Sequence, residues 1–286
     1  LCFQPIYSNV YGAPRVLLSS PPRRSSELHS HIAGPIVAVV LLVFLQPLLW
    51  FTPPTPINRV CLPIGRIVRG VVKDAYHALR QEPAIARFVI ARVIYQDGIG
   101  VALTFGSIYA AGLFGWETLE LAVFGICILG SAAIGATIGV QIDDRIGAKN
   151  TILYALGILI VGMCALLSFE PPAETADGFL STPTEQLFIG VALLLGLGIG
   201  PAGGSGRTMM ARIAPEGQAG KWFGIMALAG NAVAFTGPAL VALVTYLTES
   251  ERTGMMVAPV IIGLGALVMI TVKSDRPLLT GSVVTA

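Results

Sequence analysis

Seven stretches of the chain are long and apolar enough to cross a lipid bilayer as helices. A spanning helix needs about 20 predominantly apolar residues, because lipid offers the backbone no hydrogen-bond partner and a helix pairs its own N–H and C=O groups. All of the stretches except the second are free of charged residues. They cover residues 32–51, 88–114, 121–140, 151–169, 187–206, 223–247 and 254–272. The pattern predicts an all-α membrane protein with seven transmembrane helices.

The connections between these stretches alternate between basic and acidic. Lysine and arginine collect in the cytoplasmic connections of membrane proteins. Thirteen of the 18 Lys and Arg residues fall in connections on one side of the predicted membrane, and only Arg252 falls on the other. This distribution predicts a cytoplasmic C-terminus. The N-terminal tail is then outside although it carries Arg15, Arg23 and Arg24, so we expect residues 1–31 to be disordered or wrongly joined to the chain.

Residues 64–79, between the first two stretches, are periodic rather than uniformly apolar. Apolar side chains recur at intervals of three and four residues along one helical face, and basic side chains occupy the opposite face. The pattern predicts an amphipathic helix on the cytoplasmic leaflet, with its basic face toward lipid head groups. A lipid-lying linker is the simpler interpretation, and a regulatory or partner-binding role is the alternative.

Composition excludes several other classes of protein. The chain has 286 residues, of which 54% are hydrophobic and 12% charged, and its mean hydropathy is +0.77. Soluble domains carry about 25% charged residues. The net charge of +2 lacks the clustered basic face of a nucleic-acid binder, and the four cysteines and three histidines lack the spacing of a metal site or disulfide scaffold. The expected partners are the lipid bilayer and a small solute, with no cofactor, metal or nucleic acid.

Intramembrane enzymes, retinal proteins and ATP-driven pumps need residues that the chain does not supply. A Ser–His protease needs a histidine in a span, and the last histidine is His77. An aspartyl protease needs two intramembrane carboxylates, a retinal protein a mid-span lysine, and an ATPase a GK[ST] phosphate loop. Only Asp97 is an acid within a span, and each lysine lies at or outside a span end. We therefore expect no enzymatic activity.

The second stretch contains the charged residues at membrane depth. Charged groups within a span are costly and usually face a cavity, so Arg92 and Asp97 are the first functional candidates, with Tyr95 between them. At about 1.5 Å per residue, Asp97 lies about 15 Å inside the cytoplasmic end of the helix. Arg92 and Asp97 point about 140° apart, so we do not expect them to pair directly. A transport or gating role is predicted for Asp97, with a structural hydrogen-bonding role as the alternative.

Polar and small residues also mark the fifth and sixth stretches. Asn231 is interpreted as bonding to a neighbouring helix, with substrate binding as the alternative, and Pro238 allows a bend. Seven glycines and Pro201 crowd the fifth stretch, which permits either close helix packing or a broken helix at a cavity. Arg207 and Arg212 follow in a predicted cytoplasmic connection. The glycines are Gly190, Gly196, Gly198, Gly200, Gly203, Gly204 and Gly206.

The connection after the third stretch, GVQIDDRIGAKN, resembles the short acidic and basic signature of major facilitator transporters. Two further segments, ARVIYQDGIGVALTFGSIYAAGLFGW and GPAGGSGRTMMARIAPEGQAGKWFGIMALAGN, sharpen the resemblance to the vacuole-effluxer or autophagy-related permease branch of that superfamily. Val140 replaces the usual glycine, and Ala148 a base found in many families. The resemblance covers residues 63–271. The matching motif residues are Asp143, Asp144, Arg145, Gly147 and Lys149.

This resemblance implies a fold of twelve helices, in two six-helix halves that rock about a central cavity. The last six stretches then form a major-facilitator C-terminal half-bundle. The motif is expected to act at a gate, because carboxylates at helix ends bind helix N-termini or arginines in contacts that break and re-form. The alternative is a charged turn that only enforces orientation. The implied segments are a tail (1–31), the last helix of the N-terminal half (32–52), a cytoplasmic linker (53–85), the C-terminal half (86–273) and a cytoplasmic tail (274–286).

The predicted function is secondary transport of small solutes, and the fungal members of the branch imply amino acids. Because the chain begins with Leu1 rather than Met, we expect it to start inside a longer gene, so that the missing N-terminal half or a second copy completes the cavity. A bacterial inner membrane is the expected location. One alternative is a seven-helix receptor, which also has its N-terminus outside and its C-terminus inside. Another is a non-transporting subunit derived from a transporter half, which would keep the fold but carry no solute flux. Glycine-rich spans, short cytoplasmic connections and the linker favour the transporter.

Overall fold

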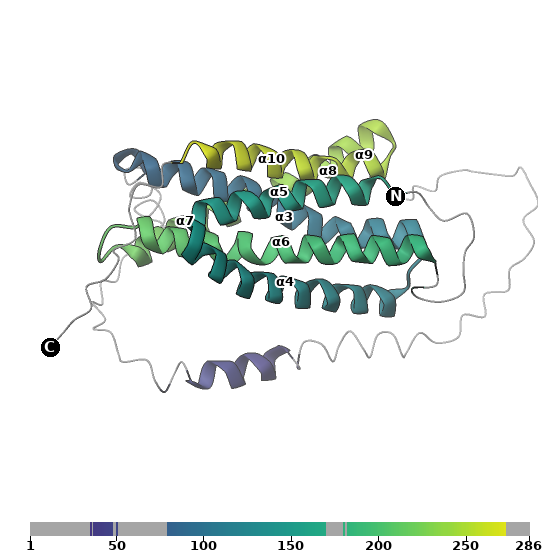
Figure 1. Ribbon diagram of the computed structural model, residues 1–286, viewed down its shortest axis with the longest axis horizontal. Coiled ribbons are helices and arrows are strands. Elements are labelled where there is room, and N and C mark those ends of the chain that lie inside the picture. Colours follow the sequence, from purple (N-terminus) through teal and green to yellow (C-terminus); the bar gives the residue numbers. More distant parts are fainter. Residues whose placement is uncertain are drawn as a thin grey trace, which may run out of the picture. The chain divides into compact units, whose positions relative to one another are not determined.

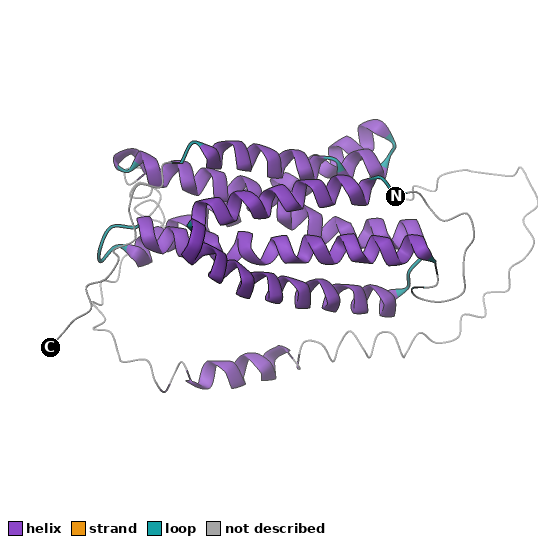
Figure 2. Ribbon diagram, viewed as in Figure 1, coloured by secondary structure: helices purple, strands orange, loops and turns teal. Residues whose placement is uncertain are grey.

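A computed structural model of the chain describes residues 35, 37–47, 50, 79–169, 180 and 182–272, and in these residues helices are the only regular elements (Figure 2). The chain divides into two units, Leu1–Leu62 and Pro63–Ala286, each described by itself. Within the first predicted span the structure describes a short apolar helix, Val37–Pro47. The seven-span count therefore remains a prediction. The expected tails and amphipathic linker helix lie outside the described residues.

Six predicted spans are present in the second unit, each as a helix or helix pair long and apolar enough to cross a membrane. The first four are single helices, and each of the last two is interrupted. They are α3 (Pro83–Phe114), α4 (Thr118–Ile146), α5 (Ala148–Leu167), α6 (Pro183–Ile213), α7 (Ala219–Val233) with α8 (Thr236–Thr248), and α9 (Glu251–Met255) with α10 (Val257–Ile270).

Prolines explain both interruptions. A proline inside a helix lacks its own N–H and clashes with the carbonyl four residues earlier. Pro238 is four residues after Ala234, which directly follows α7, and Pro259 is four residues after Met255, the last residue of α9. The bend that the sequence allows near Pro238 is therefore confirmed as a break between α7 and α8.

Helices α4 and α6 pack side by side and run parallel. The Ser131 hydroxyl donates to the Leu193 carbonyl at 2.6 Å, and a Cβ added at Gly139 would lie 2.9 Å from the Pro201 Cβ. The residues of each pair are 62 positions apart in the sequence, so the same offset relates neighbouring residues along both helices. Because Pro201 has no N–H, the Leu197 carbonyl receives no hydrogen bond from it within α6. A Cβ at Gly135 would collide with this carbonyl oxygen. Small residues thus let the two backbones touch.

The remaining helices extend this pair into a bundle. Helix α5 packs against α6 and α10, and α10 packs along α3. The long axes of these helices run in roughly the same direction (Figure 1). The span formed by α7 and α8 packs more lightly, against α3 and the span formed by α9 and α10. It is the least buried of the six, followed by α4. These two spans carry long rows of exposed apolar side chains, as expected for surfaces that face lipid or another bundle.

Candidate functional site

A polar cavity of about 470 Å³ lies among α3, α6, α7 and α8. Its volume is within the range of small-molecule sites, about 300–1,000 Å³. Three of the four residues predicted from sequence to face a cavity line it: Arg92, Asp97 and Asn231. The other polar side chains in its wall are Gln96, Thr104 and Arg207. The structure therefore brings together charged residues from helices far apart in the sequence.

Arg92 is held firmly in the cavity wall. Its side chain is only 8% exposed, and Nη1 donates to the Tyr95 hydroxyl at 3.0 Å. Tyr95 in turn donates to the Ala202 carbonyl of α6 at 3.3 Å. The guanidinium lies against the backbone of Gly206, where an added Cβ would collide with Arg92 Nη1. Tyr95 is itself fully buried behind Arg92 and orients it, although the sequence pattern places it at the cavity.

Asp97 points toward the start of α8 rather than toward Arg92. A Cβ at Gly237, the second residue of α8, would lie 2.9 Å from Asp97 Oδ2 and 2.5 Å from Val101 Cγ2. The carboxylate therefore lies against the backbone at the break between α7 and α8, where it accepts a hydrogen bond from the Gly237 N–H. The described residues show no ion pair between Asp97 and Arg92, as their positions on one helix led us to expect.

Arg207 lines the cavity although the sequence did not place it there. The sequence places it in a cytoplasmic connection, whereas α6 continues to Ile213 and Arg207 extends from that helix into the cavity wall. Gln96 and Thr104 were also missed. Thr104 is seven residues from Asp97, so the helical period alone places it on the same face. For Arg207 no such local signal exists.

The acidic motif lies at the end of α4, not in a loop. Helix α4 runs to Ile146 and α5 begins at Ala148, so the whole connection is Gly147. Gly147 has φ +86°, a backbone conformation that favours glycine. Asp144 makes an ion pair with Arg212 of α6, at 3.7 Å between Oδ1 and Nη2.

Asp143 is buried without a complete set of hydrogen bonds. It is 2% exposed, and its Oδ1 has no hydrogen-bond partner among the described residues. The parallel register of α4 and α6 places Asp143 at the level of Ser205, because these residues are also 62 positions apart. The Ser205 hydroxyl is equally buried and unpartnered. Two buried polar groups that lack a hydrogen-bond partner among the described residues therefore lie at one level of the bundle.

Lys149 secures the end of α10. Its ammonium donates to the carbonyls of Ile270 and Val272 at 2.9 and 2.5 Å. The last carbonyls of a helix have no partner within the helix, and a cation there satisfies them and complements the helix dipole. Lys149 therefore joins the N-terminus of α5 to the C-terminus of α10. Arg145, by contrast, is exposed.

We expect Lys149→Met to destabilise the fold by about 1 kcal/mol, because these carbonyls then lose a charged donor. The thermal unfolding midpoint of the purified protein in detergent measures this change. Lys221→Met is the matched control, since Lys221 is exposed at the start of α7. Equal midpoints for the two variants would show that the Lys149 contacts contribute nothing.

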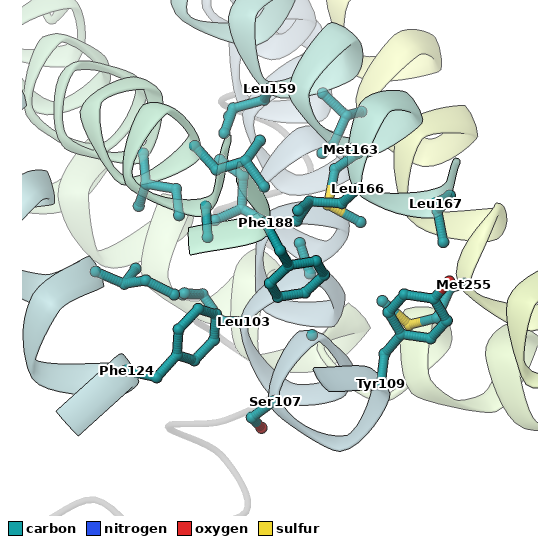
Figure 3. Close-up of a pocket in the computed structure, with 18 residues that line it drawn as sticks. Leu103, Ser107, Tyr109, Phe124, Leu159, Met163, Leu166, Leu167, Phe188 and Met255 are labelled. Carbon is teal, nitrogen blue, oxygen red and sulfur yellow. The ribbon is translucent and has the colours of Figure 1, made fainter. Parts of the chain in front are cut away.

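A second pocket is apolar. It encloses about 50 Å³ among α3, α4, α5, α6, α9 and α10, with Phe188 between Phe124 on one side and Tyr109 and Met255 on the other (Figure 3). The rings of Phe124 and Phe188 lie 6.1 Å apart within an aromatic cluster that includes Trp116. The pocket is part of the hydrophobic core. Among the described residues, no group of three or more His, Cys, Asp or Glu side chains is placed to hold a metal ion.

Comparison with known proteins matches residues 16–279 to the family described as "Vacuole effluxer Atg22 like". "Autophagy-related protein 22" of Cryptococcus neoformans var. neoformans serotype D (strain JEC21 / ATCC MYA-565) is 22% identical over 205 residues, covering 70% of this chain and 34% of the relative. "Uncharacterized MFS-type transporter YxiO" of Bacillus subtilis (strain 168) is 24% identical over 198 residues, covering 69% of this chain and 43% of the relative. The matches thus span about a third and about two fifths of the length of these two relatives.

Proposed function

Because the chain belongs to the vacuole effluxer Atg22-like family, a group of membrane transporters, we propose that its six described spans form the C-terminal half of a major facilitator secondary transporter. The cavity among α3, α6, α7 and α8 is then part of the solute pathway. One observation carries this proposal: Arg92, Asp97 and Asn231, polar side chains within apolar spans, converge on a single cavity. Intramembrane charges are retained where they face a cavity and serve transport.

The cavity needs a further wall, which we assign to an N-terminal half or a second copy of the chain. The matches cover 34% and 43% of two relatives, which leaves room in proteins of that length for another set of spans. Arg207 and Asn231 line the cavity but are exposed. The lightly packed α7–α8 span borders the same opening. A facing half-bundle would cover these surfaces and allow the two halves to rock about the cavity.

The motif at the α4–α5 junction is proposed as the cytoplasmic gate. Asp143 carries an unpartnered buried oxygen, and Asp144 pairs with Arg212 at a distance typical of a weak ion pair. Such contacts can exchange partners when a bundle rocks. Gly147 and Lys149 keep the junction in place, and Arg145 is free to contact head groups or the facing half.

We assign small solutes, with amino acids first, as the substrates, and a bacterial inner membrane with a cytoplasmic C-terminus as the location. The test uses the native product, purified through a C-terminal tag and sized on a denaturing gel, then reconstituted into proteoliposomes. Counterflow of labelled amino acids above protein-free vesicles is expected. A folded protein that exchanges no small solute would overturn the proposal and favour a non-transporting subunit.

A further inference from the structure

An apolar groove of about 390 Å³ lies over α4, α5 and α6, beside the junction of α4 and α5. Buried residues of all three helices form its floor. Exposed side chains form its rim, with Ile138, Ile142 and Ile146 on α4 and Tyr154 and Ile158 on α5. None of its lining residues lines the polar cavity, so the groove is a separate feature of the bundle.

The lining of the groove suits an apolar chain rather than a polar solute. Thr151 and Tyr154 are its only lining residues with a polar side chain. The Thr151 hydroxyl donates to the Gly147 carbonyl at 3.2 Å, so its proton is already engaged. Tyr154 is 68% exposed and stands on the rim. An occupant of the floor would therefore meet hydrocarbon, and its binding would come from buried apolar area.

The length of the groove matches one leaflet of a bilayer. The groove follows α4 from Gly135 to Ile146, which is about 16 Å at 1.5 Å per residue. The hydrocarbon core of a bilayer is about 30 Å thick, so one leaflet contributes about 15 Å. Because Ile146 is the last residue of α4, the groove begins at the end of a spanning helix and extends toward the middle of the membrane.

Arg145 lies at the end of the groove nearest the membrane surface. It is seven residues after Ile138, so at about 100° per residue the two side chains point only about 20° apart on α4. Arg145 is exposed, and among the described residues it makes no ion pair. Its neighbour Asp144 points about 100° away and pairs with Arg212. The groove thus combines an apolar floor with an unpaired cation at its end.

The groove and the polar cavity use different faces of α6. Pro201 lines the groove and Arg207 lines the cavity. These residues are six positions apart, so they point about 120° apart around the helix. The half-bundle that we assign to the cavity side therefore does not need to cover the groove, and the charge of Arg145 favours an anionic occupant from the membrane.

We propose that this groove binds one phospholipid with a net negative head group. One acyl chain lies along the floor, and Arg145 donates to the phosphate, which its planar fork fits. Basic pockets between spanning helices recognise anionic head groups in the same way. This site goes beyond the proposed transport function and does not depend on it.

Binding is tested on the full chain in detergent by native mass spectrometry, which counts bound lipids. Dioleoylphosphatidylglycerol is anionic, dioleoylphosphatidylcholine has the same chains without net charge, and glycerol phosphate has the phosphate without the chains. One phosphatidylglycerol is expected to bind about tenfold more tightly than phosphatidylcholine, because its net charge complements Arg145. Glycerol phosphate is expected neither to bind nor to displace the lipid, because it buries no acyl chain.

Two variants separate the head-group contact from the groove. Arg145→Gln is expected to weaken phosphatidylglycerol binding about tenfold and to leave phosphatidylcholine binding unchanged, since only a charged donor is lost. Arg87→Gln is its control, because Arg87 is an exposed arginine of α3 that does not line the groove. Ile142→Trp places a larger side chain in the groove and is expected to weaken binding of both lipids. Leu129→Trp is its control, at an exposed position of α4 outside the groove.

The proposal is overturned if phosphatidylcholine binds as tightly as phosphatidylglycerol, if glycerol phosphate displaces the lipid, or if either variant binds like its control. A photoreactive benzoylphenylalanine in place of Tyr154 then identifies the occupant in native membranes. A cross-link to phospholipid is expected. A cross-link to another protein segment would assign the groove to a protein partner and overturn the proposal. These outcomes do not depend on solute flux, so failure of the lipid site and failure of the transport function are distinguishable.

Discussion

Replacing Gly200 with alanine is expected to prevent assembly of the α4–α6 pair. A Cβ at this position would collide with the Ala132 carbonyl oxygen and the Ala136 nitrogen of α4. Both are backbone atoms, so no side-chain rotation relieves the contact and the helices must move apart. The movement also breaks the hydrogen bond from Ser131 to Leu193. Overpacking in a core costs about 1–3 kcal/mol, and a backbone collision is expected at or above the upper end of that range.

The measurements for Gly200→Ala are the yield of monodisperse protein on size-exclusion chromatography in detergent and the thermal unfolding midpoint. Gly203→Ala is the matched control. It makes the same substitution three residues later in the same helix, where an added Cβ meets nothing within 4 Å. Alanine also favours a helix over glycine by about 1 kcal/mol, so the control is expected to be as stable as the native chain or more stable. Native behaviour of both variants would contradict close α4–α6 packing.

Asp97→Asn is expected to reduce solute flux at least about tenfold while the protein remains folded. The amide keeps the shape of the carboxylate and its ability to accept a hydrogen bond near Gly237. The substitution removes the carboxylate, which can take up a proton or pair with a cation while the cavity opens and closes. Because a neutral side chain is less costly than a carboxylate inside a membrane, we expect the unfolding midpoint to stay level or rise.

Flux per folded protein in proteoliposomes, together with the unfolding midpoint, separates the two roles considered for Asp97. A structural hydrogen-bonding residue would lower both values, whereas a transport residue lowers flux alone. Glu216→Gln is the control, since it removes an exposed carboxylate from the connection between α6 and α7. Undiminished flux in Asp97→Asn would exclude the residue from the mechanism.

Sequence reasoning was most accurate for properties that each helix decides alone. The predicted spans 88–114 and 151–169 correspond closely to α3 and α5, because every spanning segment must independently be apolar and hydrogen-bonded. Boundaries at charged ends were less accurate. Both α4 and α6 continue past their predicted ends, through the acidic motif and past Arg207, because a helix does not need to stop where the lipid does.

By itself, the sequence determined that this is a helical membrane protein with charged residues at depth in α3, and it pointed to the transporter family. Only the tertiary structure showed that Arg207 joins Arg92 in one cavity and that Tyr95 lies behind it. It also showed that Asp143 and Ser205 share a level. The physical reason is distance along the chain. Hydrophobic period and charge act within one helix, whereas the Tyr95–Ala202 and Lys149–Ile270 contacts join residues 107 and 121 positions apart, and no local pattern encodes which helices meet.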